Sequence, residues 1–111
     1  MKDLKNRVQL IGNLGMDPEV KQFENGKKLA KFSVATSQVY YDNKGEKVED
    51  TQWHNIIAWD KDAERVEKYL AKGSHVTIEG RIVYRNYEDK QGQKRYFTEI
   101  VMNDMLLSPK K

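Results

Sequence analysis

The sequence contains no cysteine, which excludes disulfide scaffolds, thiol nucleophiles and cysteine-based zinc sites together. Its only histidines, His54 and His75, lie far apart and lack the i, i+4 spacing of a helical metal-binding pair. We therefore expect neither a metal nor a cofactor. The longest apolar run covers only Ile56 to Trp59, far below the roughly 20 residues that a membrane-spanning helix needs.

Motifs that carry catalysis are also missing. No phosphate-binding glycine loop, metal-ligand spacing or serine-centred triad occurs along the chain. The acidic residues Glu46, Glu49 and Asp50 lie beside Gly45 in a segment typical of a solubilising turn. Charged residues interrupt the N-terminal segment before it reaches the apolar length of a signal peptide. We expect a cytoplasmic protein that is not an enzyme.

Composition and length indicate one folded domain. The chain has 111 residues, of which 38% are hydrophobic and 33% charged, so a lean core must support a heavily charged surface. Three Phe, six Tyr and two Trp argue against a disordered chain. The 20 basic and 17 acidic residues leave a net charge of only +3, so binding to a polyanion would depend on how the cations are distributed.

Period-2 alternation and regularly spaced turn signals predict an all-β domain. In HVTIEGRIVYRNY, residues 75–87, one face carries Val76 and Ile78 and the other carries Arg85 and Tyr87, while Gly80 suggests a bulge. Turns are expected at Gly12–Gly15, Asn25–Gly26, Asp42–Lys47, Lys72–Gly73 and Asp89–Gln93. The strand candidates are Asn6–Gly12, Glu19–Glu24, Lys28–Tyr41, Val48–Trp59, Ser74–Tyr87 and Arg95–Leu107.

One helix is predicted over residues 60–73, where Ala63, Val66 and Leu70 fall on one face. Asp60 is a candidate N-cap and Gly73 a candidate end of the helix. Three strand regions, a short helix and a final hairpin are the order of a five-stranded Greek-key barrel of the oligonucleotide/oligosaccharide-binding (OB) type, with the helix between strands 3 and 4. We assign this domain to residues 1–108 and a short tail to 109–111.

The stretch TQWHNIIAWD, residues 51–60, carries both tryptophans. Alternation places Trp53, Asn55, Ile57 and Trp59 on one face, and His54, Ile56 and Ala58 on the other, which we interpret as the packed face. Filling a small core is one role open to the tryptophans. The other is a role at the surface, because large aromatic side chains that are exposed need a functional explanation.

Other aromatic and basic residues favour exposure. Tyr87 shares the predicted solvent-exposed face of its strand with Arg81 and Arg85. Tyr40 and Tyr41 precede a turn. Lys61 and Lys72, near the two ends of the predicted helix, also lie close to these aromatics along the sequence. Aromatic platforms among cations are the chemistry of single-stranded nucleic acid binding, because every base has a π-face and every linkage a phosphate. Without a basic recognition helix, we expect little sequence preference.

Five segments together resemble the bacterial single-stranded DNA-binding protein (SSB) family. They are NRVQLIGNLGMDPEVK, LAKFSVATS, EDTQWHNIIAW, KYLAKGSHVTIEGRI and the closing YFTEI, which follow in order over residues 4–107. The resemblance implies a homotetramer of OB domains that wraps single-stranded DNA without sequence preference and protects it in replication, recombination and repair. It also implies association with the nucleoid.

The resemblance further assigns roles to individual residues. Those implied to stack on bases are Tyr40, Trp53, Trp59 and Tyr87. Those implied to contact phosphates are Lys21, Lys61, Lys72, Arg85 and Arg95. His54 matches a residue at a subunit interface, whereas Asn55 stands where a basic residue is common in the family.

Members of the family usually continue into a flexible linker and an acidic tip that recruits other proteins, whereas this sequence ends in SPKK. Recruitment through such a tip is therefore not expected of a truncated chain or a short paralogue. Two other functions stay open. One is a primosomal replication-restart OB protein, typically dimeric, and the other is an OB adaptor for an oligosaccharide or a protein.

Overall fold

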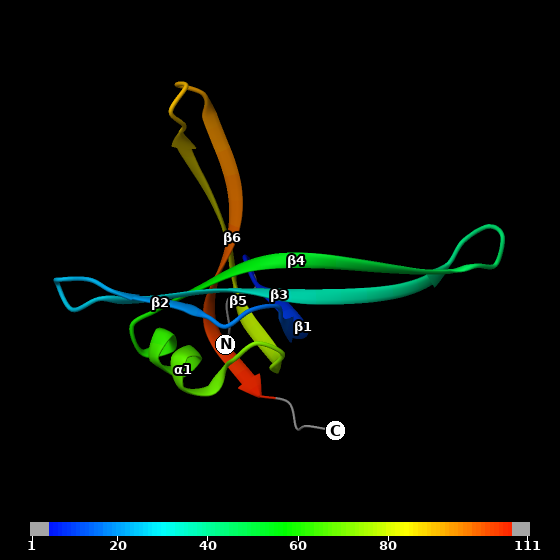
Figure 1. Ribbon diagram of the computed structural model, residues 1–111, viewed down its shortest axis with the longest axis horizontal. Helices are drawn as coiled ribbons and strands as arrows, with labels where there is room; N and C mark the ends of the chain where they lie inside the picture. The colour runs from blue at the N-terminus through cyan, green and yellow to red at the C-terminus, as the bar shows by residue number, and fades with distance from the viewer. Residues whose placement is uncertain (1–4, 108–111) are drawn as a thin grey trace.

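A computed structural model describes residues 5–107, so Leu4, Ser108 and the tail 109–111 lie outside the described residues. These described residues form six strands and one helix (Figure 1). Their bounds are β1 Val8–Leu14, β2 Glu19–Gln22, β3 Lys28–Tyr41, β4 Lys47–Trp59, α1 Lys61–Tyr69, β5 His75–Glu88 and β6 Lys94–Leu107. Most strands lie close to the predicted ranges.

The sheet closes into a barrel. Its strand order is β1-β5-β6-β4-β3-β2, and an additional pairing of Asn13 with Ala35 joins β1 back to β3. Five strands therefore form the closed barrel, and the short β2 extends it along β3. All pairings are antiparallel except β4 with β6, where Ile56 is opposite Ile100. The all-β, five-stranded barrel with a helix before the last hairpin is confirmed.

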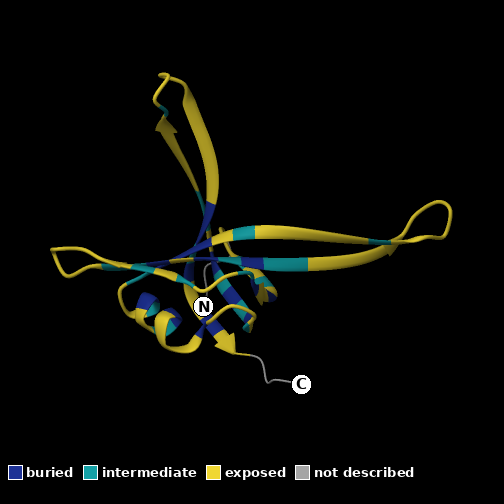
Figure 2. Ribbon diagram, viewed as in Figure 1, coloured by how far each residue is buried: buried dark blue, intermediate teal, exposed yellow. Residues whose placement is uncertain are grey.

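Two long ribbons project from this barrel. Figure 1 shows β3–β4 and β5–β6 running outward as arms, and Figure 2 shows that their outer parts are exposed while burial concentrates where the strands cross. The radius of gyration is 16.3 Å, against about 13 Å expected for a compact chain of this length. The arms account for the excess, since so much of their surface lies away from the core.

Both arms end in the same kind of turn. At the tip of β3–β4, Asp42 Oδ1 accepts hydrogen bonds from the backbone N–H groups of Lys44 and Glu46, and Gly45 has a φ of 78°. At the tip of β5–β6, Asp89 receives the equivalent bonds and Gly92 has a φ of 81°. The aspartate fixes the turn and the glycine supplies the left-handed residue. The turns predicted at these positions are confirmed.

Gly80 marks the predicted bulge. The pairing of β5 with β6 shifts register between Glu79 and Gly80. A Cβ on Gly80 would lie 2.2 Å from the carbonyl oxygen of Val101, so only glycine permits this approach of the two strands. The shift bends β5 from the barrel into its arm, and the arm therefore starts where the core ends.

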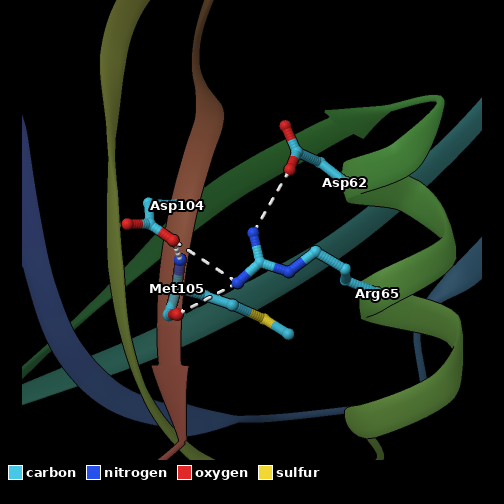
Figure 3. Close-up of polar contacts among 4 residues, drawn as sticks. All are labelled: Asp62, Arg65, Asp104 and Met105. Atoms are coloured by element: carbon cyan, nitrogen blue, oxygen red, sulfur yellow. Dashed lines mark hydrogen bonds and ion pairs between the residues drawn. The ribbon is translucent and has the colours of Figure 1, made fainter.

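Helix α1 covers one end of the barrel with Ala63 and Val66 buried, and Leu70 just beyond it is buried as well. Arg65 ties the helix to β6 (Figure 3): its Nη2 atom donates to the Met105 carbonyl at 3.3 Å and lies 3.4 Å from Asp104 Oδ1. Within residues 5–107, no helix has the length and hydropathy of a membrane span.

Three predicted details are wrong. The strand predicted to end at Gly12 continues to Leu14, because β1 must reach Val34 of β3 to close the barrel. The helix ends at Tyr69 rather than at Gly73. Asp60 occupies the N-cap position with a φ of 52°, but its carboxylate accepts from the Lys28 N–H at 3.1 Å instead of capping the helix.

Candidate functional site

The outer face of the barrel carries the alternate residues of β4. The register pairs Trp53 with Ala35, Asn55 with Ser33, Ile57 with Lys31 and Trp59 with Leu29. The opposite residues Ile56 and Ala58 are fully buried in the barrel. The predicted two-sided character of the strand is therefore confirmed. Ile57 lies on the outer face but is not exposed to solvent. It is buried because Val101 of β6 pairs with it in the middle of the sheet.

Trp53 is exposed over 60% of its surface. One side of its indole lies on Gly15, the residue directly after β1, where a Cβ would lie 2.5 Å from the ring. The backbone N–H of Gly15 is held by the Ser33 carbonyl at 3.3 Å. Backbone thus supports the ring from below while leaving a large aromatic surface open, which argues against the core-filling role for Trp53.

Trp59 ends β4 and is partly buried. Its ring stacks on Phe23, with ring centroids 6.4 Å apart and an interplanar angle of 28°. Phe23 belongs to the turn between β2 and β3, and its side chain is 40% exposed. The two roles considered for Trp59 are combined, because it packs against a neighbour and also borders the surface.

Tyr87 lies on the β5–β6 arm, is 52% exposed and meets Phe97 edge to face at 5.8 Å between centroids. Arg85 is directly opposite Phe97, and Arg95 is directly opposite Tyr87. All four side chains share one face of the arm. Phe97 was missed in the sequence, although the turn at Asp89–Gln93 fixes the hairpin register that places it beside Tyr87.

Tyr40 and His54 lie on the other face of the β3–β4 ribbon. Tyr40 is 52% exposed, but alternation puts Tyr41, not Tyr40, on the side of Trp53. His54 is partly buried, and its Nε2 lies 2.9 Å from the Thr36 hydroxyl. Stacking by Tyr40 and a subunit-interface role for His54 both stay predictions.

The five predicted phosphate contacts differ in their surroundings. Lys21 on β2, Lys61 at the start of α1 and Lys72 before β5 are exposed. Arg85 donates through Nε to Glu99 at 2.6 Å, and Arg95 through Nε to Asp89 at 3.0 Å. A guanidinium whose Nε is occupied still offers its terminal N–H groups, so these pairs orient the arginines.

A hollow of about 440 Å³ lies over β3, β4 and β6 on the outer face and is bordered by Met16, Asp17 and Glu19. We call it the β4–β6 hollow; its floor and walls include Lys31, Ser33, Asn55, Ile57, Phe97 and Glu99. Glu99 is its most buried polar residue, with 8% of its surface exposed. The sequence did not reveal Glu99 as a site residue, because its neighbour Asn55 comes from a distant strand.

At the tip of the β5–β6 arm, the carboxyl of Asp89 has a lowered pKa. Hydrogen bonds from the Gln93 backbone and the Arg95 side chain lower the pKa of this carboxyl below its ordinary value. Within residues 5–107, no cluster of three or more His, Asp or Glu side chains could hold a metal ion. The arrangement is therefore one of aromatic surfaces, cations and a polar hollow, which suits binding through stacking and charge.

Known proteins are similar to this chain in sequence. The chain is 49% identical over 100 residues to the single-stranded DNA-binding protein of Neisseria meningitidis serogroup A, with 90% of this chain and 58% of the relative aligned. It is 46% identical to single-stranded DNA-binding protein 1 of Chlorobaculum tepidum over 101 residues, 90% of this chain and 62% of the relative. The chain thus spans about three fifths of the length of these relatives.

A solved structure of Plasmodium falciparum SSB in complex with ssDNA superposes with a TM-score of 0.88 at 30% identity, covering 98% of this chain and 99% of that one. The family model described as "Single-strand binding protein family" matches residues 5–108. With nearly the whole sequence matched, this chain belongs to the single-strand binding protein family.

Proposed function

We propose that the protein binds single-stranded DNA, without catalysis, and protects it during replication, recombination and repair. The observation that carries this proposal is the continuous outer face on which Trp53, Trp59 and Tyr87 lie among cations. The likeness to a solved SSB–ssDNA complex supports it independently. Cytoplasmic location at the nucleoid follows from this function.

Binding would combine two interactions. Bases would stack on Trp53, Trp59 and Tyr87, each contact contributing roughly 1–3 kcal/mol. Lys21, Lys61, Lys72, Arg85 and Arg95 would neutralise phosphates along the strand. Tyr40 would stack on DNA that passes around the β3–β4 arm. Because a π-face and a phosphate occur at every nucleotide, such binding is largely independent of sequence.

We further propose a homotetramer. Residues 8–12 of β1 pair with β5 on one side and, within residues 5–107, with no strand on the other. Ile11 and Leu106 flank Thr77 in one outward row and are 54% and 69% exposed. A free strand edge beside exposed apolar side chains favours pairing with another copy. His54 would lie at a subunit contact.

A mobility-shift titration tests the binding. The protein should shift an oligo(dT) strand at low salt, and a duplex of equal length should compete poorly. A protein that shifts neither strand, or that binds a neutral oligosaccharide with salt-insensitive affinity, would refute the proposal and favour the OB adaptor.

Sedimentation equilibrium tests the assembly. A mass four times that of the chain is expected, and Ile11→Glu should reduce it because the charge would enter the apolar row. A dimeric mass would instead favour the primosomal restart protein. Neither result depends on DNA, so assembly and binding are judged separately.

A further inference from the structure

The lining of the β4–β6 hollow holds more acidic than basic side chains. Glu99, Asp17 and Glu19 line it, against a single basic side chain, that of Lys31. Carboxylates repel phosphates, so the DNA backbone is disfavoured inside the hollow. A base, which carries no charge, can enter. The volume of about 440 Å³ lies within the range of about 300–1,000 Å³ typical of small-ligand sites.

Glu99 lines this hollow, and its two carboxylate oxygens differ in their hydrogen bonding. Its Oε1 accepts from Arg85 Nε at 2.6 Å, and no further hydrogen bond of the Glu99 side chain is made within residues 5–107. No fully buried side-chain nitrogen or oxygen in that part of the chain lacks a partner. The unbonded Oε2 must therefore be accessible, although the residue as a whole is more than nine-tenths buried.

The neighbours of Glu99 suit a base. Phe97, 37% exposed, offers an aromatic wall, and Ile57 provides an apolar floor. The side chains of Asn55 and Ser33 make no hydrogen bond within the described chain, so their polar groups are open as well. A flat ring against Phe97 would point its polar edge at these groups. The ion pair with Arg85 holds the carboxylate in place for that contact.

We propose that the β4–β6 hollow is a base-selecting subsite in which Glu99 Oε2 accepts a hydrogen bond from an exocyclic amino group. This inference rests on the proposed binding of single-stranded DNA. An ionised carboxylate only accepts hydrogen bonds. It therefore favours cytosine, adenine and guanine, which carry exocyclic amino groups, over thymine and uracil, whose carbonyl oxygens it repels. The protein then has a composition preference beneath its general binding.

The cleanest test compares (dC) and (dU) oligomers of equal length at pH 8, because the two pyrimidines have the same size and differ at the amino or carbonyl edge. The quantity measured is the ratio of the two dissociation constants, for the wild type and for Glu99→Gln. The amide introduced by this substitution can still accept from Arg85 through its oxygen while it turns an NH₂ donor to the hollow. We expect the ratio to shift by about tenfold toward (dU) in this variant.

Glu88→Gln is the matched control, since it removes an exposed carboxylate from the same arm on the opposite face. It should raise both affinities slightly through reduced repulsion and leave the ratio unchanged. An unchanged ratio in a folded Glu99→Gln protein overturns the subsite and leaves Glu99 only orienting Arg85. Failure of the wild type to bind either oligomer would instead refute the proposed function.

Modifying the oligomer tests the subsite with the wild-type protein alone, so the result does not depend on whether Glu99→Gln folds. Replacing cytosine by 2-pyrimidinone, which lacks the amino group, should weaken binding to the wild type by several-fold relative to (dC). Equal affinities for the two oligomers would contradict the subsite even if Glu99→Gln failed to fold.

Discussion

The six-membered ring of Trp53 rests on Gly15 so closely that a Cβ on Gly15 would lie 2.5 Å from Trp53 Cζ3. The Gly15 backbone is held by β3 and cannot retreat easily. Gly15→Ala should therefore displace the indole and weaken binding of oligo(dT) by about 1 kcal/mol or more, within the range for loss of one stacking contact. Isothermal titration would measure the loss.

A double-mutant cycle provides the control. In a Trp53→Ala background, Gly15→Ala has no ring to displace and should change the affinity little further. Additive losses would show that Gly15 acts on DNA through some other route than Trp53.

Alanine substitutions on the two faces of β4 should have different effects on binding and on stability. Trp53→Ala is expected to weaken DNA binding by roughly 1–3 kcal/mol while the free energy of unfolding changes little, because the ring is 60% exposed. Ile56→Ala should instead lower the free energy of unfolding by about 2–5 kcal/mol, since Ile56 is 1% exposed. Thermal melts beside binding isotherms measure both. A large loss of stability with unchanged affinity in Trp53→Ala would return that residue to a structural role.

The exposed lysines should contribute to the salt dependence of the DNA-binding constant. Log K is expected to fall with log[salt] by about 0.7 for each phosphate neutralised. Lys21→Ala or Lys72→Ala should reduce the steepness by about that amount. Lys28→Ala is the matched control, because Lys28 is paired with Glu67 of the helix. An equal change in Lys28→Ala would mean that the slope reports net charge rather than contacts.

The β5–β6 turn should weaken in acid. Backbone hydrogen bonds from Gln93 and the side chain of Arg95 lower the pKa of Asp89 below 3.8, its ordinary value. The stabilisation is therefore present above about pH 3.8 and is lost as the pH falls through the lowered value. NMR titration of the Asp89 carboxyl measures this directly. Asp89→Asn should abolish the acid transition that the NMR signal of Gly92, in the same turn, would report. A pKa of Asp89 at or above its ordinary value would contradict this expectation.

Local patterns predicted much of this architecture. Alternation separated Trp53 from Ile56, the Asp and Gly residues of the two tips predicted their turns, and Gly80 predicted the bulge. Each of these depends on residues near one another in the chain, so the sequence contains the necessary information.

Long-range pairing explains what local patterns missed. Ile57 is buried and Glu99 meets Asn55 only because β6 runs parallel to β4, which no local period encodes. Asp60 fails to cap the helix because Lys28, from a distant strand, donates to its carboxylate. Phe23 supports Trp59 from a turn whose position depends on the pairing of β2 with β3.

Tryptophan fluorescence during an oligo(dT) titration reports stacking on the indoles without an intermediate step. Trp59→Phe leaves Trp53 as the sole tryptophan, and Trp53→Phe leaves Trp59. Base stacking predicts saturable quenching at low salt in the wild type and in both variants, since each indole meets a base. Unchanged fluorescence in all three proteins, at DNA concentrations that saturate a mobility shift, would contradict it.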